Sequence, residues 1–154
     1  MSGDEAQLNE LFVGTFHKVL AWEERELRNM GCKNLTVKEL HVLTAINRLE
    51  KQQHHTMTRV AKEMDISVGA LTTAINTLVK KGYVQRGYRE DDRRIVLVSL
   101  TKDGENANQL HDQYHQLMIR EVGKSLSEEE LKILVQSLNK MEIFIKKKGM
   151  KSDD

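Results

Sequence analysis

Four side chains of the types that bind metal ions stand out in this sequence. His111 and His115 are four residues apart, which places both imidazoles on one face of an α-helix. Glu24 and His41 belong to earlier helical stretches that we expect to fold against them. Imidazole and carboxylate groups are common zinc ligands, so these residues form a candidate zinc site. The alternative is that the histidines satisfy hydrogen bonds around an apolar pocket and hold no metal.

A run of charges from Arg89 to Arg94 offers a second kind of chemistry, because narrow minor grooves of DNA attract arginine. We expect Asp92 to hold either Arg93 or Arg94 and so to shape the turn. The other arginine, together with Arg89, is then free to enter or flank the groove. The sequence leaves open which arginine Asp92 holds, and the competing interpretation is a solvated charged turn.

The elements around this turn are those of a winged helix. Tyr83–Arg86 and Ile95–Ser99 are rich enough in β-branched and aromatic residues to pair as strands. Gly82 before them suits the left-handed conformation that ends a helix. Two short helices come first, at 58–64 and 67–81, and the tight gap between them has helix-turn-helix spacing.

The second short helix has the pattern of a helix that binds the major groove. Leu71, Ile75 and Leu78 form its buried stripe, which leaves small polar groups facing outward. Residues expected to contact bases or phosphates are Thr58, Ser67, Thr72, Thr73 and Asn76, with Lys80, Lys81 and Arg86 expected on phosphates or in solvent. The alternative is that these are ordinary solvated side chains.

The remaining chain is predicted to be helical, since it contains no proline and its apolar residues recur at three- and four-residue spacing. A long helix runs from Leu8 to about Asn29, where Gly31 stops it. Capping boxes at 36–39 and 127–130 open two more helices, and Thr101 caps another. Gln52 to His55 is a polar loop. We therefore predict a mainly α fold of six helices with a small β wing.

The composition fits one compact domain spanning residues 1–154. Net charge is only +1, but residues 56–101 hold eight Lys and Arg against five Asp and Glu, so the middle is the basic part. The single cysteine, Cys32, excludes an intramolecular disulfide, and its role is left open. No signal peptide or membrane span is recognisable, so we expect a cytoplasmic protein.

The outer helices are predicted to form a dimer. The apolar stripes of about 5–30 and 102–148 are too long for a small domain to cover alone. The winged helix-turn-helix then occupies about 36–100. A two-fold pair of such heads suits palindromic double-stranded DNA, with half-sites about 10 bp apart.

The order of these elements, with Gly82–Val84, Asp92–Arg94, Leu97–Thr101 and Gly104, resembles the MarR family of transcriptional regulators over nearly the whole chain. The resemblance implies an intertwined homodimer in which the first and last two helices interleave. It also implies that Arg94 is the arginine that inserts into the minor groove.

A narrower similarity links the chain to the FabT-like branch, which represses fatty-acid biosynthesis genes in Gram-positive bacteria. It is visible in 19–28, 38–41, 69–73 and 110–118. The resemblance implies that long-chain acyl groups on acyl carrier protein act as corepressor. Candidate effector-pocket residues are Phe12, Phe16, Trp22, His41, Leu110, His111, Tyr114, His115 and Met118, and the alternative for the aromatic and Met positions is plain core.

The sequence thus favours a repressor of fatty-acid biosynthesis genes. Alternatives are a zinc-responsive repressor, a regulator with another small-molecule effector, or a winged scaffold kept for protein contacts alone. Nothing favours an enzyme, because the sequence has no nucleophile-base set, phosphate-binding glycine loop or H-E-x-x-H pattern.

Overall fold

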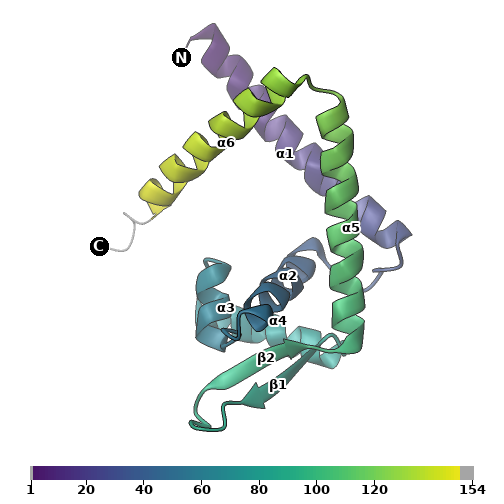
Figure 1. The fold of residues 1–154 in the computed structure, drawn as a ribbon, viewed down its shortest axis with the longest axis vertical. Coiled ribbons are helices and arrows are strands. Elements are labelled where there is room, and N and C mark those ends of the chain that lie inside the picture. Colours follow the sequence, from purple (N-terminus) through teal and green to yellow (C-terminus); the bar gives the residue numbers. More distant parts are fainter. Residues whose placement is uncertain (1, 150–154) are drawn as a thin grey trace. The chain divides into compact units, whose positions relative to one another are not determined.

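The computed structural model describes residues 2–149, which form six helices and one β-hairpin (Figure 1). The prediction of a mainly helical chain with a small β wing is confirmed. Residue 1 and residues 150–154, assigned above to the same domain, lie outside the described residues. In chain order the elements are α1 (Gly3–Asn29), α2 (Val37–Lys51), α3 (Met57–Glu63), α4 (Val68–Lys80), β1 (Val84–Tyr88), β2 (Val96–Leu100), α5 (Lys102–Lys124) and α6 (Glu128–Gly149).

The chain divides into two compact units at a point within α5. The first unit extends to Tyr114 and contains α1 to α4, the hairpin and the first half of α5. The second begins at His115 and contains the rest of α5 with α6. Within residues 2–149, every helix is too short or too polar to span a bilayer.

Side-chain caps fix where the helices begin. At the start of α2, Thr36 accepts from the backbone of Glu39, whose carboxylate accepts in return from the Thr36 backbone. Ser127 makes the same reciprocal contact before α6, so both predicted capping boxes are confirmed. A third box, at Ser2 and Glu5, starts α1 earlier than the predicted Leu8. Each cap contributes about 1 kcal/mol to helix stability.

The core of the first unit lies between α2 and α4. Leu40, Leu43 and Ile46 of α2 are fully buried, as are the three residues of the predicted stripe on α4, Leu71, Ile75 and Leu78. Burying an aliphatic side chain of this size contributes about 1.5–3 kcal/mol. This packing turns the polar face of α4 away from the core.

The hairpin is antiparallel, with a register that runs from Val84 opposite Leu100 to Tyr88 opposite Val96. Gly82, which precedes it, has a φ of 81°, the left-handed conformation predicted for it. The other edge of β2 is also paired: Thr56 forms a bridge with Leu97, and the Val98 N–H donates to the His55 carbonyl at 3.0 Å. The sequence predicted only a polar loop up to His55. The wing is therefore attached to the chain that enters α3.

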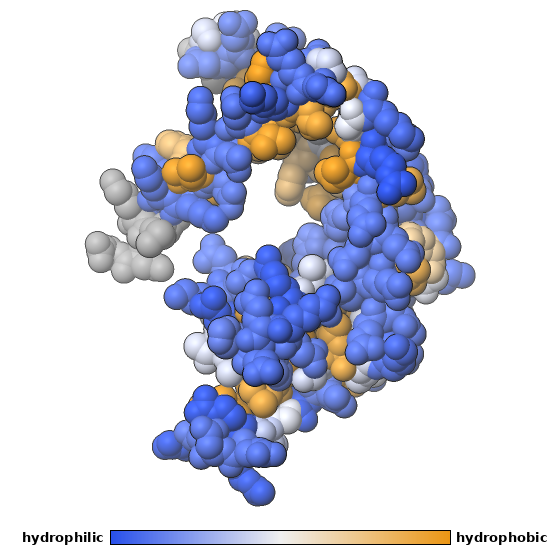
Figure 2. Space-filling model, viewed as in Figure 1, coloured by the Kyte–Doolittle hydropathy of each residue, from blue (hydrophilic) through white to orange (hydrophobic). Residues whose placement is uncertain are grey.

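Large apolar side chains remain exposed on α1, α5 and α6, the helices outside the winged helix-turn-helix of about residues 36–100 (Figure 2). In α1 they include Leu8, Leu11, Phe12 and Phe16. In the second unit they include Leu117, Val122, Leu131, Leu134, Leu138 and Ile145. Apolar patches on this scale are rare on monomers and indicate a protein contact.

Gly104 is predicted to be essential for stability. A Cβ added there would lie 2.1 Å from the carbonyl oxygen of Tyr83, which is backbone and accepts the Thr101 N–H. Gly104→Ala should therefore lower the free energy of unfolding by about 2 kcal/mol or more. Urea denaturation at fixed protein concentration measures this change.

Gly123→Ala in the same helix is the matched control, because a Cβ at Gly123 meets nothing within 4 Å. Gly123 lies in the last turn of α5, where a glycine destabilises less than in the helix interior, so the substitution should leave stability unchanged or raise it by less than about 0.5 kcal/mol. Equal effects of the two substitutions would contradict the close approach at Gly104.

Candidate nucleic-acid interface and metal centre

The outer face of α4 carries hydroxyl groups whose orientation is already fixed. Thr72 donates to the carbonyl of Val68 at 2.8 Å, and Thr73 donates to that of Gly69 at 3.3 Å. Each threonine oxygen thus keeps its lone pairs for a donor on DNA, with its methyl group beside it. Ser67 caps α4 by accepting from Ala70, which leaves its hydroxyl proton available to a phosphate.

Asn76 and Arg86 lie together at the junction of α4 and β1. The Arg86 guanidinium donates to the Asn76 side-chain oxygen at 2.6 Å. The Asn76 amide nitrogen keeps both its donors, and its oxygen keeps a second lone pair, so a bidentate contact with adenine is still possible. Arg86 therefore orients Asn76 in addition to carrying charge. Thr58, in the first turn of α3, and Lys80, at the end of α4, are exposed.

At the wing, Asp92 holds Arg94. Its carboxylate accepts from Nε and Nη2 of Arg94, each at 3.0 Å, and from the Arg94 backbone N–H. The hydrogen bonds from the Arg94 side chain and backbone lower the pKa of Asp92. The Arg94 side chain is nevertheless 91% exposed. The expectation that Asp92 holds one of the two arginines is confirmed, and the held residue is Arg94. Insertion of Arg94 into the minor groove, which the resemblance implies, stays a prediction.

The other wing arginines differ from each other. Arg93 is exposed. Arg89, predicted to be free, pairs through Nε with Asp91 at 2.5 Å. Both members of that pair are solvent-exposed, so the contact is weak and can exchange for a phosphate.

The prediction for Lys81, on phosphates or in solvent, was wrong. Its side chain instead joins the end of α4 to the start of α2, a contact called the clamp below. Its ammonium donates to the Glu39 carboxylate at 2.8 and 2.9 Å and to the Asn34 carbonyl at 2.6 Å. The Tyr83 hydroxyl donates to the side-chain oxygen of Asn34 at 2.7 Å. Partial burial alone would raise the pKa of Glu39, but the hydrogen bonds from Lys81 and Thr36 lower it below its ordinary value.

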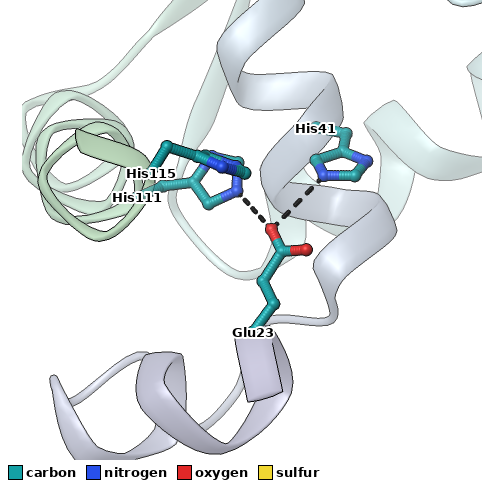
Figure 3. A group of neighbouring side chains, drawn as sticks. All are labelled: Glu23, His41, His111 and His115. Carbon is teal, nitrogen blue, oxygen red and sulfur yellow. Dashed lines mark hydrogen bonds and ion pairs between the residues drawn. The ribbon is translucent and has the colours of Figure 1, made fainter. Parts of the chain in front are cut away.

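A second polar cluster joins α1, α2 and α5 (Figure 3). The Glu23 carboxylate lies 2.7 Å from Nε2 of His111 and 3.4 Å from Nε2 of His41. Glu23 and His111 are almost fully buried, whereas His41 is half-exposed. His115 follows His111 by one turn of the same helix.

The hydrogen-bond pattern fixes a proton on Nε2 of His111, because that nitrogen faces a carboxylate oxygen at 2.7 Å. Nδ1 of the same ring lies 3.1 Å from the hydroxyl of Thr44, which is also 3.1 Å from the Leu40 carbonyl. If Thr44 donates to Leu40, the imidazole is the charged, doubly protonated form. If Thr44 donates to Nδ1, the imidazole is neutral.

The same donors fit a zinc ion with a small adjustment. The ligand atoms of Glu23, His41 and His111 lie within 4.8 Å of one another, and tetrahedral zinc ligands are about 3.3 Å apart. The Glu23–His41 separation already matches, while the Glu23–His111 contact must open slightly. Thr44 would then orient the imidazole of His111 through a hydrogen bond at Nδ1, the ring nitrogen that does not bind the metal. Metal-binding histidines usually have such a partner. Zinc would replace the Nε2 proton, so its binding would release a proton.

Comparison with known proteins places this arrangement in a family. The MarR family model matches residues 35–96, which include α2, the helix-turn-helix and most of the hairpin. FabT from Streptococcus pneumoniae, solved in complex with DNA, is 32% identical, with 93% of this chain and 98% of that chain covered and a TM-score of 0.85. The chain belongs to the MarR family.

Other regulators are similar to this chain over shorter or more distant matches. A cysteine-to-serine mutant of MarR from E. coli, complexed with operator DNA, is 28% identical over 87% of this chain and 96% of that chain, with a TM-score of 0.61. An uncharacterised HTH-type transcriptional regulator of Bacillus subtilis, YwhA, is 30% identical over 86 residues, 56% of this chain and 62% of its own length. The match thus spans less than two thirds of that curated relative. These relatives are transcriptional regulators and not enzymes.

Within this MarR-family chain the metal-site prediction needs one correction, because Glu23 and not Glu24 meets the histidines. Successive residues of a helix differ by about 100° in direction, so a shift of one position turns Glu24 out to solvent. Leu20, Glu23 and Leu27 have the three- and four-residue spacing of the inward face. A glutamate inside an apolar stripe was the signal that the sequence analysis missed.

The predicted effector-pocket residues have diverse surroundings. Trp22 packs edge-on against buried Tyr114, with ring centroids 5.9 Å apart, and Leu110 packs against the core. Phe12 and Phe16 are about half-exposed. Met118 and His115 lie in the second unit. The pocket role of these residues stays a prediction.

The Lys81–Glu39 clamp predicts a pH dependence of stability. Because folding lowers the pKa of Glu39, the pair stabilises the protein fully above the ordinary glutamate value of 4.5, and this contribution is lost as pH falls through the lowered pKa. Glu39→Gln keeps the capping box but removes the charge. The variant should lose less stability than the parent chain between about pH 6 and about pH 3.

Urea denaturation across this pH range measures the difference. Glu105→Gln is a suitable control, since Glu105 forms an exposed pair with Lys102 in the first turn of α5. Parallel pH profiles for the parent chain and Glu39→Gln would show that the clamp contributes nothing.

Proposed function

We propose that this protein is a sequence-specific DNA-binding transcriptional repressor. The observation that carries the proposal is that one chain presents both an exposed arginine and an outward polar helix face. The arginine is Arg94, which Asp92 holds at the tip of the hairpin, and the helix is α4. An α-helix suits the major groove and an arginine the minor groove. The DNA-bound structures of FabT and MarR support the same role. Such a protein acts on the chromosome, and hence in the cytoplasm.

The DNA-binding form is a homodimer in this proposal. Its support is the exposed apolar surface on α1 and, separately, on α5 and α6, which a second copy would cover. A two-fold dimer presents two copies of α4 to a palindromic operator. Membership of the MarR family gives independent support.

The regulated genes that we propose are those of fatty-acid biosynthesis, with long-chain acyl-acyl carrier protein as corepressor. Support comes from the resemblance to the FabT-like branch and from the 32% identity to FabT over nearly the whole chain. A corepressor must bind the DNA-competent conformation better than the alternative, and a difference of about 1–3 kcal/mol changes DNA affinity about 5- to 150-fold.

Zinc-dependent repression is the second candidate function, and the specific observation behind it is the convergence of Glu23, His41 and His111. These groups would hold the ion, whose chemistry here is structural: it would fix α1, α2 and α5 to one another.

The wing is predicted to contribute directly to DNA affinity. Arg94→Ala should weaken operator binding about 5- to 150-fold, as expected for loss of one groove contact. Asp92→Asn should weaken it less, because Arg94 is then present but not oriented. Fluorescence anisotropy with a labelled duplex measures both, and circular dichroism checks that the variants are folded.

Arg120→Ala, an exposed arginine on α5, is the control and should bind DNA like the parent chain. Unchanged affinity of Arg94→Ala would exclude the wing from the interface. If no duplex binds at any salt concentration, the DNA-binding proposal itself fails, and a role in protein contacts takes its place.

The effector is identified by the same anisotropy assay on a palindromic promoter duplex of lipid-synthesis genes. Chelator-treated protein should bind DNA more tightly after addition of long-chain acyl-acyl carrier protein, and unacylated carrier should have no effect. Tightening with zinc instead, lost in His41→Gln, would favour the second function. His41 is the suitable ligand to replace, since it is half-exposed and its loss leaves the Glu23–His111 contact in place.

A further inference from the structure

An open pocket of about 430 Å³ lies between the α2–α3 connection, the first turn of α3 and the wing. Its size is within the range of about 300–1,000 Å³ that small-molecule sites occupy. It belongs entirely to the first unit, and neither the polar face of α4 nor the Glu23 cluster contributes a lining residue. The lining residues are Gln53, His54, Thr56, Arg59, Arg89 and Leu97.

Backbone contacts hold the wall of this pocket in place. Thr56 forms a bridge with Leu97 of β2, so the start of α3 lies beside that strand (Figure 1). Gln53, just after α2, has a left-handed conformation with a φ of 58°, and the His54 N–H donates to the Leu49 carbonyl at 2.8 Å. The lining residues of the α2–α3 connection are therefore positioned before any ligand binds, which lowers the cost of binding.

Arg59 supplies a positive charge that no carboxylate neutralises. Glu63 lies four residues further along α3, the spacing at which a glutamate and an arginine of one helix usually pair. The Glu63 carboxylate instead accepts from the guanidinium of Arg48 on α2. Among residues 2–149, no acidic side chain pairs with the exposed guanidinium of Arg59. Arg59 is therefore available to an anion in the pocket.

Arg89 supplies a second guanidinium, from the wing. Its partner Asp91 is not a lining residue, and their exposed pair can exchange for another anion. Thr56 adds a hydroxyl whose oxygen accepts from the Arg59 backbone N–H at 3.2 Å, which leaves its proton available to a ligand. The lining contains no carboxylate. Two guanidinium groups beside a hydroxyl donor suit the several oxygens of a phosphate.

We propose that this pocket binds a phosphate group, with Arg59 and Arg89 on its oxygens and the Thr56 hydroxyl as a further donor. Two sources carry this group: the backbone of DNA and a free phosphorylated compound. With the first source the inference rests on the proposed function, and the bound phosphate would fix α3 and the wing to one point of the duplex. With the second, the occupied pocket would join α3 to the wing in the absence of DNA.

Arginine side-chain NMR on the full chain tests the pocket without DNA. Protein labelled with ¹⁵N-arginine is titrated with inorganic phosphate at constant ionic strength, and the two Nε–H signals are assigned with Arg59→Gln and Arg89→Gln. We expect saturable shifts of both signals. Arg59→Gln should weaken phosphate binding, measured at Arg89, about two- to fivefold. Lys62→Gln removes a charge from the same helix outside the pocket lining and should bind phosphate like the parent chain.

Acetate tests the choice of ligand, since it has one charge and two oxygens in a plane. Equal saturation of the two signals by acetate and by phosphate would overturn the phosphate assignment. Equal, unsaturable shifts of all the arginine signals would show general screening of charge and would overturn the pocket itself.

Anisotropy with the palindromic duplex across a salt series tests the DNA backbone as the source. Arg59→Gln should then reduce the slope of log Kd against log salt concentration by about 1, whereas Arg120→Gln on α5 should leave it unchanged. Duplexes that each carry one uncharged methylphosphonate locate the contact. At one position the modification should weaken binding of the parent chain but not of Arg59→Gln, because the two changes remove the same interaction.

The two measurements separate the sources. A reduced salt slope assigns the pocket to the DNA backbone, and saturable phosphate shifts with an unchanged slope assign it to a free phosphorylated compound. Absence of both effects would overturn the proposal. If the parent chain binds no duplex, the proposed function fails, while the NMR titration still decides whether the pocket binds phosphate.

Discussion

A buried contact between a carboxylate and an imidazole joins helices of the first unit that are far apart in sequence. Glu23 and His111 are both removed from water, and an ionised carboxylate left there alone would cost several kcal/mol. The contact therefore holds α1 against α5 at one defined point. His111 also meets Thr44, and Glu23 meets His41, so α2 is joined to the same point. A proton or ion that alters this contact acts on three helices at once.

The winged head depends on a second polar contact, at the far end of α4. Lys81 and Tyr83 attach the end of α4 and the start of the hairpin to Asn34 and Glu39, next to the first turn of α2. Between this clamp and the Glu23 cluster, α2 is fixed at both Glu39 and His41. The surface that faces DNA is thereby connected to the interior through α2, and not only through the aliphatic core.

Local signals in the sequence were sufficient for most of the fold. The capping boxes at Thr36 and Ser127, the aliphatic stripe on α4 and the left-handed Gly82 depend on residues within a few positions of one another. Partner choices between distant residues could not be predicted in this way. The clamp joins residues 42 positions apart in sequence, and the Glu23–His111 contact joins residues 88 apart. The choice between Glu23 and Glu24 depends on the rotation of α1, which spacing alone fixed only to within one residue.

The pair of Asp92 and Arg94 has an electrical consequence. A carboxylate and a guanidinium in bidentate contact have no net charge, so at a distance larger than the pair itself Asp92 and Arg94 behave as a dipole. Its field decays faster than that of a lone arginine and contributes little to the first attraction between the protein and a phosphate backbone. That attraction falls to unneutralised cations such as Lys80 and Arg93. In the proposed DNA complex the Asp92–Arg94 pair would therefore act only after encounter, at contact range, where the width of a groove matters more than the charge of the duplex.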